Sequence, residues 1–93
     1  MRPQRAGRGW PRPLAATLAR VPRPSPCFLD KQVKLHREGG QRWRNEDGSR
    51  LYEWDDLHGE IEVYDRRGFH LGTLNAVTGR REKEPTKGRR IDV

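Results

Sequence analysis

The chain has 93 residues, of which 31% are apolar and 35% are charged, so it can form one domain with a small core and no more. Its formal net charge of +7 indicates a polyanionic partner, nucleic acid or the ribosome ahead of an acidic protein or a membrane surface. The single cysteine, Cys27, excludes an internal disulfide and a cysteine-rich metal site. No apolar run is long enough to span a bilayer.

The first part of the chain differs in composition from the rest. Residues 1–30 hold six of the seven prolines and six arginines, and no acidic residue precedes Asp30. Such a segment does not sustain a helix or a central strand, apart from one turn over 14–20. We therefore predict a disordered Pro/Arg-rich tail or linker over 1–27 and one folded domain over 28–93.

The domain is expected to be mainly β (α+β), with elements that follow one another closely. A short helix is predicted over 27–37, with Asp30 as its N-cap, and Gly39-Gly40 ends it. β-prone runs separated by turn residues predict antiparallel strands. These strands span 42–46, 49–55, 58–65 and 69–74, and an extended stretch interrupted at Pro85 covers 80–90.

Residues 51–64 place five carboxylates and a histidine among aromatic and β-branched residues. We predict a hairpin that reverses at 56–57, with Asp55 opposite His58 and, in consequence, Glu53 opposite Glu60. Alternation then sorts the side chains onto two faces. The acidic face carries Glu53, Asp55, His58, Glu60 and Glu62, and the apolar face carries Tyr52, Trp54, Ile61 and Val63.

Crowded carboxylates beside an imidazole can supply an acid and a base near neutral pH, although a solvated strand face with a chance histidine fits the same spacing. Basic residues around the hairpin are candidates for RNA phosphate contacts. They include Arg42, Arg44, Lys83, Lys87 and Arg90. Trp43 and His70 are candidates for stacking on unpaired bases, and Trp43 fits a core position equally well. Acids inside a basic surround repel phosphate, so they favour a nuclease over a passive RNA binder.

Residues 41–91 also carry a specific set of motifs. They are Arg42-Trp43, Asp47-Gly48, Tyr52-Glu53-Trp54-Asp55, His58-Gly59-Glu60, Glu62, Tyr64, His70-Leu71-Gly72, Thr78-Gly79 and 87–91. This set resembles the C-terminal cytotoxic ribonuclease domain of ribosome-inactivating E-type colicins and cloacin, or of a polymorphic toxin that carries the same domain. In two places the chain departs from that pattern. The turn between Tyr64 and His70 is one residue shorter, and Arg90 stands where those toxins have an uncharged polar residue.

The resemblance implies a strongly twisted antiparallel sheet with a short N-terminal helix. It also implies an endoribonuclease that cuts 16S ribosomal RNA in the decoding site without a metal or other cofactor. An acidic immunity protein would protect the producing bacterium, from which the toxin, a monomer when free, would be delivered to act in the target-cell cytoplasm. The catalytic positions of the family fall on Asp55, His58, Glu62 and Arg89, and Glu60, with Glu53, would support them.

The groups present permit cleavage by attack of a 2′-hydroxyl on the adjacent phosphorus, giving a 2′,3′-cyclic phosphate. We assign Glu62 as base and His58 as acid, although the sequence leaves the exchange of these two roles open. Asp55 would orient His58, and Arg89 would stabilise the charge on phosphorus. Two alternatives stand beside this one: a metal-dependent nuclease that uses His58, Glu60 and Glu62 as ligands, and a non-catalytic RNA-binding or ribosome-binding domain.

Overall fold

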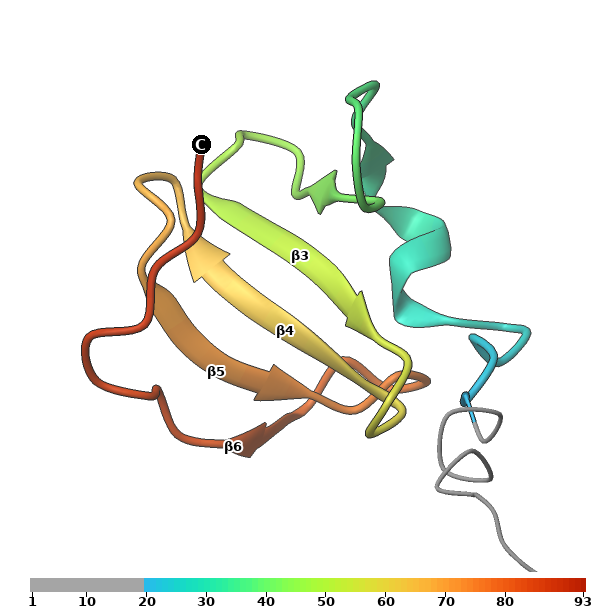
Figure 1. Cartoon of the computed structure of the whole chain (residues 1–93). Coiled ribbons are helices and arrows are strands. Elements are labelled where there is room, and N and C mark those ends of the chain that lie inside the picture. The colour runs from blue at the N-terminus through green and yellow to red at the C-terminus, as the bar shows by residue number, and fades with distance from the viewer. Residues whose placement is uncertain (1–19) are drawn as a thin grey trace, which may run out of the picture.

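The computed structural model describes residues 20–93, which form one six-stranded antiparallel sheet with its strands in chain order (Figure 1). A 3-10 helix, η1 (Phe28–Lys31), precedes the sheet. The strands are β1 (Val33–Lys34), β2 (Trp43–Arg44), β3 (Arg50–Asp55), β4 (Glu60–Asp65), β5 (His70–Leu74) and β6 (Arg81–Lys83). The predicted mainly β class is confirmed. Within residues 20–93, no helix is long and apolar enough to cross a membrane.

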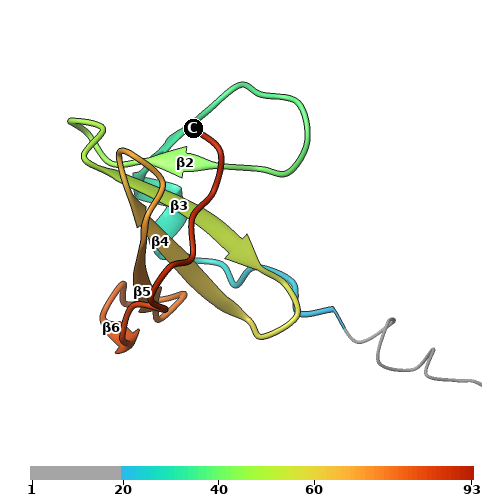
Figure 2. The same ribbon diagram turned by 60° about the vertical axis from the view of Figure 1, so that its left-hand side comes forward.

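The two faces of the sheet differ in what covers them. On one face, the segment that contains η1 contributes Cys27 and Leu29 to the core. This core is completed from the strands by Trp43, Tyr52, Ile61 and Val63. Figure 2 shows β5 crossing the direction of β3 steeply, so the sheet is strongly twisted. The opposite face carries the carboxylates.

The β3–β4 hairpin lies where the sequence predicts it, but the predicted register is wrong by two residues. Asp55 pairs with Glu60 rather than with His58, and Glu53 pairs with Glu62. The strands are joined by a four-residue turn, 56–59, closed by the Gly59 N–H on the Asp55 carbonyl at 2.8 Å. Asp-Leu suits a two-residue turn poorly, so the chain uses a longer one. Because side chains alternate with a period of two, a shift of two residues leaves the assignment of faces intact.

The predicted helix over 27–37 is wrong in length and in its cap. Only Phe28–Lys31 is helical, Cys27 occupies the N-cap position, and Val33–Lys34 is already a strand. Asp30 instead turns its carboxylate back to accept the Cys27 backbone N–H at 2.9 Å. The segment has little regular structure but buries Cys27 and Leu29. The β-branched Val33 that follows suits the edge strand β1.

Other element bounds also differ from the sequence-based ones. The strand predicted over 42–46 is limited to Trp43–Arg44, and the one predicted from residue 58 begins at Glu60. Of the extended stretch 80–90, only Arg81–Lys83 is a strand. All but the last residue of the turn expected over 14–20, and most of the tail expected over 1–27, lie outside the described residues, so the boundary at Phe28 stays a prediction.

Candidate active site

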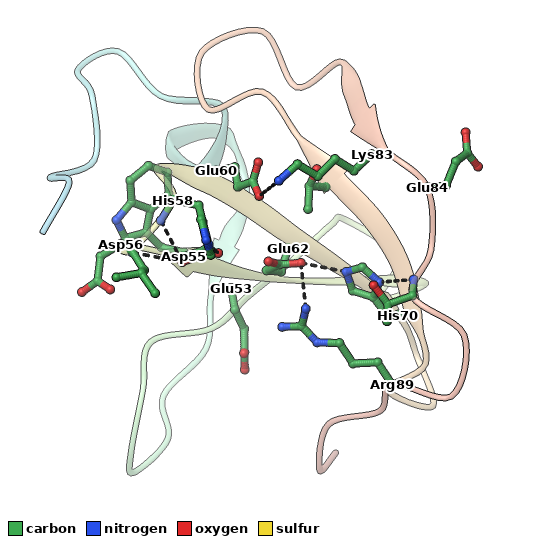
Figure 3. Close-up of a pocket in the computed structure, with 14 residues that line it drawn as sticks. Glu53, Asp55, Asp56, His58, Glu60, Glu62, His70, Lys83, Glu84 and Arg89 are labelled. Atoms are coloured by element: carbon green, nitrogen blue, oxygen red, sulfur yellow. Dashed lines mark hydrogen bonds and ion pairs between the residues drawn. The ribbon is translucent and has the colours of Figure 1, made fainter. Parts of the chain in front are cut away.

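The acidic face of the sheet forms the floor of a cavity. Cross-strand pairing aligns Glu53, Glu62, Thr73 and Lys83 in one row across β3, β4, β5 and β6. The cavity above this row has a volume of about 490 Å³ (Figure 3). Its lining includes Asp55, His58, Glu60, Glu62, His70, Lys83, Thr86 and Arg89.

At the turn end of the cavity, Asp55 holds His58. One carboxylate oxygen, Oδ2, lies 2.8 Å from His58 Nδ1, and the other, Oδ1, accepts the backbone N–H groups of Leu57 and His58. Burial by itself raises the pKa of Asp55, but the hydrogen bonds from His58 and Leu57 outweigh it and leave this pKa below its ordinary value. The His58 side chain is 61% exposed. With Nδ1 directed at Asp55, Nε2 is the nitrogen free to meet a ligand.

The centre of the cavity holds a second ion pair. Lys83 Nζ lies 2.8 Å from Glu60 Oε1, and the Glu60 side chain is only 10% exposed. The hydrogen bond to Glu60, together with its negative charge, raises the pKa of Lys83. Lys83, predicted from its charge as an RNA contact, is therefore a cation inside the site.

A third cluster lies deeper, around Glu62. Its Oε1 is 2.7 Å from His70 Nε2 and 3.5 Å from Arg89 Nη1. Arg89 also donates from Nη2 to the Tyr64 hydroxyl at 2.9 Å. The side chains of Glu62 and His70 are 9% and 2% exposed, whereas that of Arg89 is 44% exposed. The guanidinium thus closes the open side of a buried carboxylate–imidazole pair.

Two comparisons place the chain among known proteins. The sequence profile of the Cytotoxic family matches residues 18–92. The chain is a member of the Cytotoxic family. Escherichia coli colicin E3 is 42% identical to this Cytotoxic domain over 52 residues, which cover 55% of the chain and 9% of the colicin. Colicin-E6 and cloacin, also from Escherichia coli, are 40% and 38% identical over 63 residues, 62% of the chain and 11% of each relative. The chain therefore spans about a tenth of the length of these relatives, and the resemblance inferred from its motifs is confirmed.

The Cytotoxic domain places the predicted site residues in two groups. Asp55, His58, Glu60, Glu62, Lys83, Arg89 and Glu53 line the cavity, whereas Arg42, Arg44, Lys87 and Arg90 do not. Arg42 is buried and bonds Glu53 Oε2 at 2.8 Å and the Asp92 carbonyl at 2.6 Å. Arg44 donates to two nearby backbone carbonyls.

Arg90 and Lys87 lie on the outer surface. Arg90 donates from Nε to the Arg67 carbonyl at 3.0 Å, and its guanidinium stacks on the half-exposed Phe69 ring. Lys87 is exposed in the segment that follows β6. These two side chains can contact a large ligand, but they do not reach a group bound inside the cavity.

His70 is the site residue that sequence reasoning missed. Its assignment to base stacking is wrong, because the residue is only 6% exposed and its ring lies under the C-terminal segment. The stacking alternative for Trp43 is also wrong, since Trp43 is 3% exposed and belongs to the core. Its position beside Glu62 depends on the pairing of β4 with β5, where His70 lies opposite Tyr64 and the register shifts between Val63 and Tyr64, so no local sequence pattern predicts it.

The groups that could bind a metal ion already have hydrogen-bond partners in this structure. Among the described residues, Asp55, His58 and Glu60 each place one possible ligand atom within 4.8 Å of the others. However, the Lys83 ammonium is bonded to Glu60 and Asp55 is bonded to His58. A divalent ion would have to displace a cation that already neutralises part of the cluster.

Proposed function

We propose that this Cytotoxic domain is an endoribonuclease that cuts 16S ribosomal RNA in the decoding site of the bacterial ribosome, by acid–base catalysis without a metal ion. The observation that carries the proposal is the presence of a carboxylate, an imidazole and a guanidinium around one cavity: Glu62, His58 and Arg89. Such a set provides both proton transfers and a stabilising charge for phosphodiester cleavage. The similarity to two colicins and cloacin supports a toxin role.

Glu62 acts as the base. Its Oε1 accepts hydrogen bonds, while no residue within 20–93 bonds to its Oε2. A carboxylate held by one oxygen can take the proton of the 2′-hydroxyl at the other. The O2′–P bond then forms as the P–O5′ bond breaks, and the product is a 2′,3′-cyclic phosphate.

His58 acts as the acid. Its Nδ1 is directed at Asp55, so Nε2 is the atom that delivers a proton to the leaving 5′-oxygen. The Asp55 carboxylate fixes the ring orientation and stabilises the imidazolium from which that proton comes. Arg89, 3.5 Å from Glu62, stabilises the negative charge that gathers on the phosphoryl oxygens.

The proposal includes partners and a place of action. A formal net charge of +7 suits both the ribosome and a small acidic immunity protein that would protect the producer. The domain would be delivered from the producing bacterium as part of a larger toxin and would act as a monomer in the target-cell cytoplasm. Association with the immunity protein should weaken as ionic strength rises, since its attraction is electrostatic.

The deciding experiment replaces acid and base together. Purified domain and its His58→Ala/Glu62→Ala variant are incubated with bacterial ribosomes, and release of a discrete 3′ fragment of 16S RNA is followed. We expect the variant to bind ribosomes nearly as well as the parent while cleavage disappears. Unchanged toxicity of the variant would favour the non-catalytic ribosome-binding alternative, and unchanged cleavage would assign the catalysis to other residues.

The close approach of Asp55, His58 and Glu60 keeps metal dependence as a second candidate. We expect cleavage to continue in excess chelator, because Lys83 and Arg89 already provide positive charge at the cavity. Loss of cleavage in chelator, restored by one divalent ion, would establish the metal-dependent alternative instead.

A further inference from the structure

Both ring nitrogens of His70 are engaged, and the backbone decides which of them carries the proton. The Thr86 backbone N–H points at His70 Nδ1 over 2.8 Å. An amide nitrogen can only donate, so Nδ1 is an acceptor and the proton lies on Nε2. From there it is donated to Glu62 Oε1, 2.7 Å away. A buried imidazole in one fixed tautomer therefore joins the carboxylate to the segment after β6.

The backbone of His70 holds the same segment at a second point. Its N–H donates to the Arg89 carbonyl at 3.0 Å, and the Arg89 N–H donates to the Thr86 carbonyl at 3.1 Å. Residues 86–89 thus form a small turn, and His70 of β5 is hydrogen-bonded to both of its ends. Arg89, on the last position of this turn, is presented to Glu62 and Tyr64.

We propose that His70 is the positioning residue of the site, because it fixes the Glu62 carboxylate and the Arg89 guanidinium in position relative to each other. With its side chain only 2% exposed, His70 does not reach substrate, so it acts through its two partners. This inference rests on the proposed ribonuclease function. It goes beyond that function by assigning to a buried histidine the alignment of base and cation against the scissile phosphate.

The two hydrogen bonds of the ring can be removed one at a time. An asparagine amide can place its oxygen near the position of His70 Nδ1 and keep the bond from Thr86, but it provides no donor to Glu62. A glutamine amide can place its nitrogen near Nε2 and keep the donor to Glu62. The pair His70→Asn and His70→Gln therefore separates the carboxylate contact from the loop contact.

The test measures single-turnover cleavage at saturating ribosome. We expect His70→Asn to lower the rate on the order of 10²-fold, as for a catalytic group misplaced by about 1 Å, and His70→Gln to retain more activity. The ribosome concentration at half-saturation should stay as in the parent. His36→Asn, at an exposed histidine outside the cavity, is the matched control and should cleave at the parental rate.

A structural role is separated from a positioning role by combining His70→Asn with Glu62→Gln. If His70 acts through Glu62, the second substitution should reduce the rate little in a protein that already carries the first. Full additivity, or a parental rate for both His70 variants, would overturn the inference. If His70→Asn does not fold, judged by its thermal transition, His70→Ala, which also removes the donor to Glu62, is combined with Glu62→Gln in its place. A parent that does not cleave ribosomes refutes the proposed function itself, whatever the variants do.

Discussion

Two carboxylate–histidine pairs line one cavity. Their hydrogen bonds are similar in length, but their burial and their separation along the chain differ. Asp55 and His58 lie 2.8 Å apart, are three positions apart in the chain, and leave the imidazole 61% exposed. Glu62 and His70 lie 2.7 Å apart, come from different strands, and are buried. The exposed imidazole can exchange protons with a ligand. The buried one cannot reach a ligand, so its contribution is to order the carboxylate beside it.

The burial of each pair determines how much folding stability is lost when one of its residues is substituted. His58 is 61% exposed, so its contact with Asp55, which is 17% exposed, is partly screened by water and its loss costs the fold less. A buried polar pair carries a desolvation cost, and removal of one partner leaves the other without compensation. For function the two pairs differ less, because both serve the same proposed reaction.

The largest expected effect comes from opening the exposed side of the buried pair. Arg89→Ala removes the guanidinium from Glu62 and Tyr64, and should lower single-turnover cleavage at saturating ribosome on the order of 10²–10³-fold, by analogy with the loss of one oxyanion donor. Arg90→Ala removes a cation that stacks on Phe69, outside the cavity. It should weaken ribosome binding and flatten its salt dependence with little change in the saturated rate. The reverse ranking would move the catalytic role to Arg90.

An intermediate effect is expected from straining the turn that carries the exposed pair. Gly59 has φ +71°, and a Cβ there would approach Val21 Cγ1 to 3.0 Å. Gly59→Ala should cost about 1–2 kcal/mol from backbone strain alone, lower the melting temperature by several degrees, and reduce cleavage by displacing His58. Gly48→Ala is the matched control, because Gly48 has φ +77° with no atom within 4 Å of its Cβ position. Equal losses of activity in the two variants would show that the turn geometry does not govern His58.

The smallest effect concerns acid stability. Asp55 has a pKa held below the ordinary 3.8, so it stabilises the folded state above that pH and loses this contribution as pH falls through its folded value. Asp55→Asn should therefore flatten the decline of unfolding free energy below about pH 4, measured by urea denaturation.

Asp65→Asn provides the comparison for that measurement. Backbone N–H groups, first that of Phe69, hold the pKa of Asp65 low in the same direction, at the end of β4 away from the cavity. Both substitutions should flatten the acid limb, but only Asp55→Asn should also lower cleavage. Loss of activity in both would mean that acid stability, rather than the orientation of His58, explains the Asp55 result.

The sequence was sufficient for what depends on local pattern. Alternation in β3 and β4 assigns the acidic and apolar faces correctly, even though the register that carried the prediction is off by two residues. The contact between Asp55 and His58 needs only one turn of chain, which is why the proposed link between them could be drawn before the fold was known.

The second pair could not be predicted in the same way, because the local pattern predicts an exposed histidine. In the run Phe69-His70-Leu71, apolar alternation would bury Phe69 and Leu71 and expose the histidine. The structure leaves Phe69 41% exposed and His70 6% exposed. An irregularity between Val63 and Tyr64 shifts the pairing, and a chain segment with no strand signal, residues 84–91, covers the imidazole. Both causes are long-range, so no window of sequence contains them.

The short turn between Thr86 and Arg89 has a consequence for how the domain can be inactivated. Every strand is complete by Lys83, while the exposed peptide bond after Lys87 lies between the amide that binds His70 and the guanidinium that binds Glu62. A trypsin-like protease that cuts there would leave the sheet whole but break the covalent continuity between the two ends of the turn. The released end would be held by contacts such as the Ile91 N–H on the Gly68 carbonyl. We expect the nicked protein to remain folded and to be unable to cleave, because the sheet stays whole while Arg89 is no longer joined covalently to Thr86.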